Sequence, residues 1–101
     1  MITATAIQRV RQGKEAELIR LMKDLTDEVK ANEPGCTIFT YVRSTDKPRT
    51  YLVIEQYADQ KAFDAHHATA YLKAFIPKMM ACLEGPPEVE TYGDVFVAPS
   101  P

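Results

Sequence analysis

Two neighbouring segments, residues 36–44 and 51–58, constrain the fold most, because each carries large apolar side chains on both of its faces. Both are rich in β-branched and aromatic residues, which favour strands, and the polar segment 45–49 between them predicts a hairpin. Successive side chains of a strand point to opposite faces. One face therefore carries Ile38, Val42, Leu52 and Ile54, and the other carries Phe39, Tyr41, Tyr51, Val53, Glu55 and Tyr57. Neither face suits open water, so we expect both to be covered.

The segment from Lys14 to Ala31 has the pattern of an amphipathic helix. Its apolar residues recur at spacings of three and four, and charged residues occupy the other side. The helix is expected to stop at Glu33, because the residue before a proline avoids the α region. Pro34 and Gly35 then form a turn, for which glycine tolerates positive φ, and a strand starts at Cys36. Residues 2–10 alternate weakly and predict an earlier strand.

The C-terminal half predicts two further helices and a last strand. Asp59 is expected to cap a helix over residues 60–68, and Thr69 a second one that Pro77 should kink or restart. The run Gly85-Pro86-Pro87 ends the helical region, and residues 88–97 have the pattern of a strand. We expect one domain over residues 1–97 and a C-terminal tail over residues 98–101.

This order of elements is β-α-β-β-α-β, which predicts an α+β fold: a ferredoxin-like antiparallel sheet with its helices on one face. Helices on one face leave the other face of the sheet, with its own large apolar residues, without a cover. Sheet-on-sheet pairing of two copies would hide that face symmetrically, and twofold dimers are the commonest oligomers. The sequence therefore predicts a homodimer.

Composition excludes several classes of partner. The chain is 46% hydrophobic and 26% charged, and its apolar runs are far shorter than the roughly 20 residues of a membrane span. The net charge is −2 and no stretch concentrates Lys or Arg, so we expect neither nucleic acid nor membrane as a partner. The N-terminus shows no secretory signal, which favours a cytoplasmic protein. Cys36 and Cys82 lack ligand-like spacing, so neither a zinc site nor a disulfide framework is expected.

Three short stretches carry a family resemblance. They are Asn32-Glu33-Pro34-Gly35-Cys36, Glu55-Gln56-Tyr57 and Ala62-Phe63-Asp64-Ala65-His66. Together they resemble the antibiotic biosynthesis monooxygenase (ABM) family, and the resemblance extends from Ile2 to about Tyr92. It implies a dimeric α+β barrel, in which the sheets of two subunits close on each other and the C-terminal strand often reaches toward the partner.

His66 and Glu55 are the candidate catalytic residues. His66 stands where the family pattern has its helix histidine, and an imidazole can take or give a proton near neutral pH. The alternative interpretation is that His66 is a half-exposed surface histidine without a catalytic role. His67 points about 100° away around the helix, so we expect it at the surface rather than in the same pocket. Glu55 lies on an apolar strand, where a carboxylate must be paired or hydrogen-bonded. It is a candidate base, or it orients a neighbouring tyrosine or arginine.

Four aromatic residues are candidates for contact with a planar substrate: Tyr57, Tyr71, Phe39 and Tyr41. Tyr57 is the strongest, because it ends its strand beside the helix of His66. Such residues are also ordinary members of a core or an interface. No glycine-rich phosphate cradle is present, and the adjacent histidines do not converge on a metal ion. We therefore expect no bound cofactor and no metal.

The resemblance implies a cofactor-independent monooxygenase that oxidises a small aromatic quinol or polyphenol with O2 to a quinone. The haem-degrading branch of the superfamily uses a strand asparagine and a helix tryptophan, but this chain has no Trp and no Asn in its first strand. Two alternatives stay open: an isomerase acting on a small sugar derivative, and a non-catalytic dimeric ligand-binding or stress-response protein. A phosphorylated sugar would need converging cations, for which Arg9, Arg43 and Arg49 are the candidates.

Overall fold

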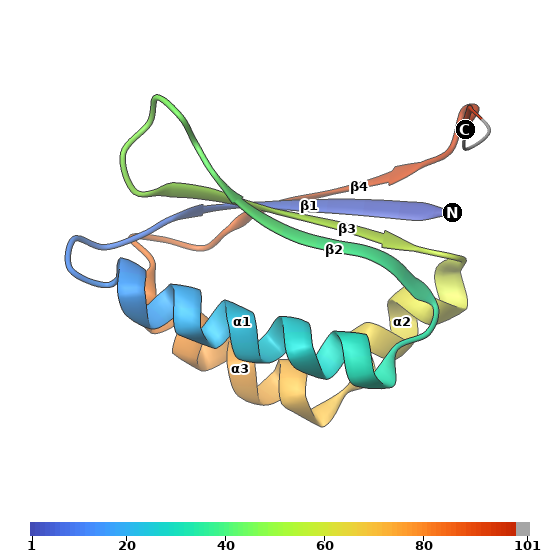
Figure 1. Ribbon diagram of the computed structural model, residues 1–101, viewed down its shortest axis with the longest axis horizontal. Coiled ribbons are helices and arrows are strands. Elements are labelled where there is room, and N and C mark those ends of the chain that lie inside the picture. The colour runs from blue at the N-terminus through green and yellow to red at the C-terminus, as the bar shows by residue number, and fades with distance from the viewer. Residues whose placement is uncertain (99–101) are drawn as a thin grey trace.

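The computed structural model describes residues 1–98 as one antiparallel sheet with helices below it (Figure 1). The elements in chain order are β1 (Ile2–Arg9), α1 (Glu15–Asn32), β2 (Cys36–Arg43), β3 (Thr50–Tyr57), α2 (Gln60–Ala68), α3 (Ala70–Cys82) and β4 (Glu88–Gly93). The strands lie in the order β2-β3-β1-β4, each antiparallel to its neighbours. The ferredoxin-like α+β arrangement predicted from the sequence is confirmed.

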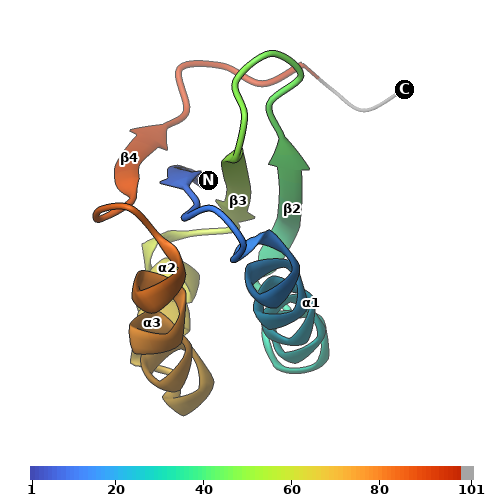
Figure 2. The ribbon, with the colours of Figure 1, turned by 90° about the vertical axis from the view of Figure 1, so that its left-hand side faces the viewer.

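All three helices cover the same face of the sheet. Figure 2 shows α1 below the β2 side, with α2 and α3 below the β4 side. Both predicted caps are present, since the Asp59 carboxylate accepts from the Ala62 amide at 2.8 Å and the Thr69 hydroxyl accepts from the Leu72 amide at 3.3 Å. Helix α3 continues through Pro77, so no new helix starts there. Within residues 1–98, no helix has both the length and the apolar character needed to cross a membrane.

The core lies between the sheet and the helices, and the alternation predicted for the hairpin is confirmed. On β3, the side chains of Tyr51, Val53 and Tyr57 are buried on the helix side. They pack with the apolar faces of α1 and α3, whose buried residues are Leu18, Met22, Leu25, Val29, Leu72, Phe75, Met79 and Cys82. On the opposite face of the sheet, Ile38 and Val42 are exposed.

The last strand is shorter than predicted, because β4 ends at Gly93 rather than at residue 97. Its pairing partner β1 begins at Ile2, which lies opposite Gly93, so the ladder between the two strands ends at this pair. The N-terminal amine instead forms an ion pair with Asp94, at 3.0 Å. Of the expected tail, residues 99–101 lie outside the described residues.

Candidate functional site

His66 is deeply buried at the sheet end that faces α2. Its side chain is 3% exposed, although the sequence places it in a short polar helix. The imidazole lies 5.5 Å from the ring of Tyr57 and 6.0 Å from that of Phe39, measured between centroids. Its Nδ1 atom lies 2.9 Å from both carboxylate oxygens of Glu33. His66 is therefore a buried histidine with a specific partner rather than a surface residue.

The Pro34–Gly35 turn places Glu33 beside His66. Glu33 caps the end of α1, and its amide donates to the Val29 carbonyl. The turn then passes so close to α2 that a Cβ atom on Gly35 would lie 2.6 Å from Cβ of Ala62. Gly13, not Gly35, adopts positive φ, so the expected reason for this glycine was wrong. Gly35 is needed because α2 leaves no room for a side chain, and this close approach brings Glu33 and His66 together.

Glu55 approaches the other ring nitrogen of His66. Its Oε1 atom lies 3.6 Å from Nε2, which is too long for a direct hydrogen bond. The same oxygen accepts a 2.5 Å hydrogen bond from the hydroxyl of Tyr57, two residues along β3 on the same face. Burial, followed by the charge of Glu55, raises the pKa of Tyr57 far above its ordinary value, so the phenol stays protonated and donates.

Glu33 determines which nitrogen of His66 carries a proton. Its carboxylate also accepts a hydrogen bond from the hydroxyl of Tyr71. Burial and this bond raise the pKa of Tyr71, which therefore remains a donor. A carboxylate only accepts hydrogen bonds, so the proton shared with His66 lies on Nδ1. The Nε2 atom is left to face Glu55, where it can accept a proton from a bound molecule.

A cavity of about 140 Å³ lies beside His66 and Glu55, between the sheet and the helices. Its walls are mostly apolar and come from all layers of the fold, including Leu25, Phe39, Val53, Leu72, Phe75 and Met79. The exposed side chains of His67, Ile76 and Val89 also border it, so it opens to the surface beside the edge strand β4. An apolar cavity with a few polar groups at one end is typical of a small-molecule site.

The structure divides the predicted site residues into two groups. His66, Glu55 and Phe39 border the cavity. Tyr41, Tyr57 and Tyr71 are not among the residues that line it, and their hydroxyls donate to Gln8, Glu55 and Glu33 respectively. These three tyrosines therefore fix the orientation of polar groups at or near the cavity, and their predicted contact with a substrate stays a prediction.

His67 is exposed as predicted, but it also borders the same cavity as His66, which the helical angle between them led us not to expect. The cavity extends around α2 far enough for both side chains to reach it. His67 Nδ1 lies 2.9 Å from the Phe63 carbonyl, and its ring lies 4.5 Å from the Phe63 ring between centroids. It belongs to the opening and not to the buried hydrogen-bond network.

Sequence reasoning missed two polar residues of this region, Glu33 and Gln8. Glu33 was visible only as the residue before Pro34, and nothing in the local sequence indicates a partner 33 residues away. Gln8 offered a clearer signal, because it alternates with Ala4 and Ala6 on the helix-facing side of β1. A polar residue at a buried strand position indicates a specific hydrogen-bonding task.

Cys36 packs beside this network as a thiol. Its Sγ atom contacts the Ile38 carbonyl at 3.3 Å. Burial, with the nearby charges of Glu33 and Glu55, raises the pKa of the Cys36 thiol to about 11. It is therefore not a thiolate nucleophile near neutral pH.

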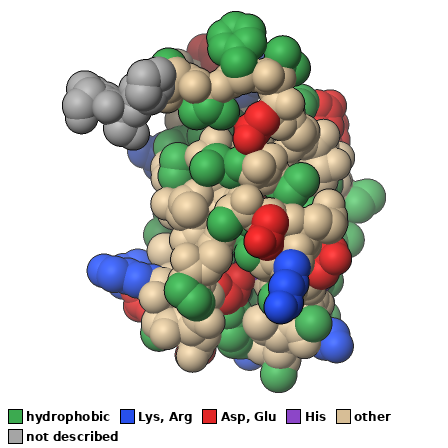
Figure 3. All heavy atoms as spheres, turned by 90° about the vertical axis from the view of Figure 1, so that its right-hand side faces the viewer, with side chains coloured by type: hydrophobic (Ala, Val, Ile, Leu, Met, Phe, Trp, Pro, Cys, Tyr) green, Lys and Arg blue, Asp and Glu red, His purple; other side chains and the backbone are tan. Residues whose placement is uncertain are grey.

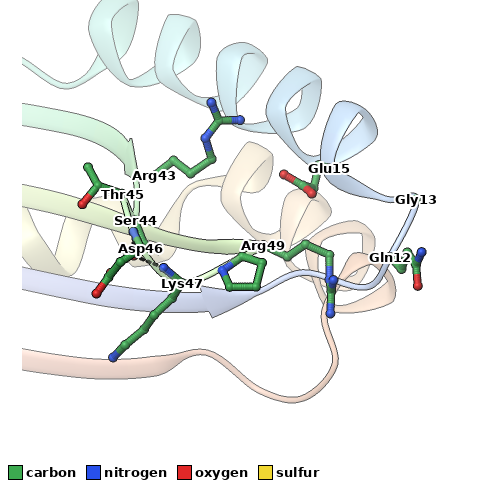
Figure 4. Close-up of a pocket in the computed structure, with 10 residues that line it drawn as sticks. Gln12, Gly13, Glu15, Arg43, Ser44, Thr45, Asp46, Lys47 and Arg49 are labelled. Carbon is green, nitrogen blue, oxygen red and sulfur yellow. Dashed lines mark hydrogen bonds between the residues drawn. The ribbon is translucent and has the colours of Figure 1, made fainter.

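A second, larger cleft of about 560 Å³ lies between the loop of residues 44–49 and the start of α1, at the other end of the sheet. Arg43, Lys47 and Arg49 border it, but Figure 4 shows them pointing in different directions: Arg43 toward α1, Lys47 away from the helices and Arg49 toward the loop before α1. Arg49 also donates to the Val10 carbonyl at 3.1 Å. These cations do not converge on one ligand.

The remaining candidate cation, Arg9, forms a 2.5 Å ion pair with Glu88 and does not border the His66 cavity. Among residues 1–98, no group of three or more His, Cys, Asp or Glu side chains is arranged to hold a metal ion. What the His66 site offers chemically is a proton acceptor, a carboxylate and an apolar chamber.

Comparison with known proteins identifies the family. The antibiotic biosynthesis monooxygenase family model matches residues 1–78. A protein from Caulobacter crescentus, provisionally named an antibiotic biosynthesis monooxygenase, has a crystal structure that covers 94% of this chain and 90% of its own, with 36% identity and a TM-score of 0.89. A Shewanella oneidensis protein is 29% identical, with coverages of 90% and 87% and a TM-score of 0.83. No curated protein sequence matches this chain.

A conserved protein from Methanosarcina mazei is 25% identical, with coverages of 90% and 89% and a TM-score of 0.85. The likeness thus extends over almost the whole sheet and all three helices. The family match includes β1, the Pro34–Gly35 turn, Glu55 and the helix of His66. The resemblance first seen in the short motifs is confirmed, and the chain belongs to the antibiotic biosynthesis monooxygenase family.

Proposed function

We propose that this protein is a cofactor-independent monooxygenase that oxidises a small quinol or polyphenol with O2 to a quinone. The observation that carries the proposal is the placement of His66. Its Nδ1 proton is held by Glu33, while Nε2 is directed toward Glu55 at the edge of an apolar cavity. The 3.6 Å gap between Nε2 and the Glu55 carboxylate leaves both groups available to a substrate hydroxyl.

In this reaction the protein has two tasks, which are to transfer protons and to exclude water. Nε2 of His66 takes the proton of a substrate hydroxyl, which makes the ring electron-rich enough to reduce O2. A carbon–oxygen bond then forms between O2 and a ring carbon beside the phenolate, and the proton held by His66 converts the resulting peroxide anion to a hydroperoxide. Its O–O bond breaks as that carbon loses its hydrogen as a proton and becomes a carbonyl, and the departing hydroxide takes this proton and leaves as water. One oxygen atom stays in the quinone, and the substrate supplies both electrons that reduce the other.

The lining of the cavity favours an aromatic substrate over a phosphorylated sugar. Among the described residues, no Lys or Arg borders it, and the candidates Arg9, Arg43 and Arg49 all lie elsewhere. A phosphate group in an apolar cavity without cationic partners would carry a large desolvation cost. Aromatic and aliphatic walls are instead suited to a planar ring.

Oxygen uptake by purified protein, treated with a chelator, tests the proposal directly against a panel of quinols and phenols. We expect enzyme-dependent uptake of one O2 per substrate consumed, with quinone formation followed by absorbance. In isotopically labelled O2, one labelled atom should enter each quinone. Absence of uptake across the panel, combined with saturable binding of the same compounds, would assign the cavity to a non-catalytic ligand-binding protein.

We further propose that the protein is a homodimer joined through the open face of the sheet. Ile38 and Val42 are exposed there, next to the half-buried Leu52 and Ile54 of β3. Figure 3 shows hydrophobic side chains at the top of the molecule, on the side of the sheet away from the helices. In the segment that follows β4, Val95 and Phe96 are almost fully exposed. Apolar surface of this extent is typical of an interface, and a second copy would cover it symmetrically.

A charge on the open face should separate the dimer. We expect Leu52→Arg to raise the dimer dissociation constant by about 100-fold or more, because the twofold axis would place two unpaired arginines in one apolar interface. Sedimentation velocity measures the change. Ile19→Arg is the matched control, since Ile19 is an exposed apolar residue on α1 and lies away from this face. A monomeric wild-type protein at micromolar concentration would contradict the proposal.

A further inference from the structure

The cavity has a second polar group, Gln8, at a distance from His66. Ala4, Ala6 and Gln8 of β1 all border it. Ala4 pairs with Glu55 in the sheet register, and Gln8 pairs with Tyr51. Four residues of strand separate the two levels, which corresponds to about 13 Å along the strand. The cavity therefore has Glu55 and His66 toward one end and an amide toward the other, with apolar walls between them.

The amide nitrogen of Gln8 lacks a strong acceptor. Gln8 is 1% exposed, and among the described residues the hydrogen-bond acceptors of its Nε2 atom are the sulfur atoms of Met79 and Met22, at 3.5 and 3.8 Å. A thioether is a weak acceptor, whereas an amide offers two N–H donors. A buried donor in this situation is stabilised when an oxygen atom becomes available as its acceptor.

Tyr41 fixes the direction in which this amide points. Its hydroxyl donates to the Gln8 carbonyl oxygen at 2.7 Å, and its ring stacks on Tyr51 with a centroid distance of 5.2 Å. Burial raises the pKa of Tyr41, so its phenol remains a donor. The carbonyl end of Gln8 is thus occupied, and the N–H end is left on the side of Met22 and Met79, two residues that border the cavity.

The volume of the cavity indicates the size of ligand that it accommodates. An apolar protein cavity of about 150 Å³ accommodates a benzene molecule. The cavity beside His66 measures about 140 Å³. Its volume is therefore sufficient for one six-membered ring.

We propose that this site selects a single-ring aromatic ligand with oxygen atoms on opposite sides of the ring. One oxygen is a hydroxyl that meets His66 and Glu55, and the other accepts a hydrogen bond from Nε2 of Gln8. The inference rests on the proposed function for the fate of the ligand, but it concerns binding and can be tested without turnover. Gln8 is then a specificity-determining residue. It binds the ligand oxygen at the end of the ring opposite to the one that reacts beside His66.

Two ligands that differ at one position test this selection. Hydroquinone and para-cresol share a ring and one hydroxyl, and differ by a hydroxyl in place of a methyl group. Their dissociation constants are measured by calorimetry without oxygen, so that no oxidation occurs. We expect Gln8→Met, which keeps the chain length and removes the amide, to lower the preference for hydroquinone over para-cresol by about tenfold. The affinity for para-cresol should stay within about twofold.

Tyr41→Phe is the second variant, because it removes the hydroxyl that orients Gln8 without touching the cavity. It should reduce the same preference, by less than Gln8→Met does. In the wild-type protein, the side-chain amide resonances of Gln8 in a proton–nitrogen correlation spectrum should shift with hydroquinone and not with para-cresol. This measurement uses the wild-type protein, so it tests the inference even if Gln8→Met fails to fold.

Three results would overturn the inference: an unchanged preference in Gln8→Met, amide resonances that respond equally to both ligands, or a naphthalene diol that binds as tightly as hydroquinone. Lack of binding by either single-ring ligand at millimolar concentration would overturn it as well. Failure of the proposed monooxygenase activity has a different signature. In that case the Gln8-dependent preference persists without oxygen, and no uptake follows when oxygen is admitted.

Discussion

Replacing His66 by asparagine is expected to lower the rate of quinol oxidation by about 100-fold or more, which is the typical contribution of one general acid–base group. Asparagine keeps a polar side chain that can donate to Glu33, but it has no group that takes a proton near neutral pH. The loss should appear in kcat more than in KM, because the apolar walls that hold the ring are untouched. Oxygen uptake under single-turnover and steady-state conditions measures it.

The control for this variant is Lys61→Ala, an exposed substitution on the same helix that should leave turnover unchanged. Circular dichroism and sedimentation check that the His66 variant keeps its fold and its oligomeric state. Wild-type turnover in His66→Asn would exclude proton transfer by the imidazole. The task would then pass to Glu55, the other ionisable side chain of this network on the cavity.

Most of the fold was predictable because its signals are local. The alternation in residues 36–58 assigned each side chain to a face, and the caps at Asp59 and Thr69 follow from residue type and spacing. The end of β4 was not predictable in the same way. It depends on where β1 begins, and a strand without a partner has no ladder to continue.

Of the candidate site, the sequence indicated the two central residues but not the residues that contact them. His66 and Glu55 could be named because a histidine and a glutamate stood at positions marked by the family pattern and by an apolar strand. Glu33 and Gln8 could not, because their roles depend on contacts between distant segments: Glu33 with α2, and Gln8 with Tyr41 of β2. The residues that connect a site to its scaffold are the least visible in a sequence, since their spacing follows no period.

The three tyrosines illustrate contacts that a sequence does not show. Their rings were expected to touch a planar substrate, and the structure shows that each hydroxyl donates to a polar group at or near the cavity: Tyr57 to Glu55, Tyr71 to Glu33 and Tyr41 to Gln8. Burial raises the pKa of all three, so each remains a donor at any pH near neutrality. They restrict the carboxylates and the amide to one orientation before a ligand arrives. This lowers the conformational-entropy cost of binding the ligand.

Glu33→Gln provides the sharpest test of this arrangement. The Glu33 carboxylate accepts from two donors, Nδ1 of His66 and the hydroxyl of Tyr71, while its side chain is only 8% exposed. An amide can accept on one side only, so its NH2 group must face one of these donors. We expect the free energy of unfolding to fall by about 2 kcal/mol, the usual cost of leaving a buried donor without an acceptor. Chemical denaturation measures this loss.

The same substitution should also lower turnover by about 100-fold or more, because an amide that donates to Nδ1 moves the imidazole proton to Nε2 and removes the acceptor from the cavity. Nitrogen NMR of the His66 ring reports this exchange of tautomers, which a purely structural role for Glu33 would not produce. Glu28→Gln is the matched control, because Glu28 is an exposed glutamate near the end of the same helix. It should change stability by less than about 0.5 kcal/mol. A Glu33→Gln protein with the wild-type tautomer and wild-type turnover would show that His66 does not depend on Glu33, and that the burial of this pair serves the fold alone.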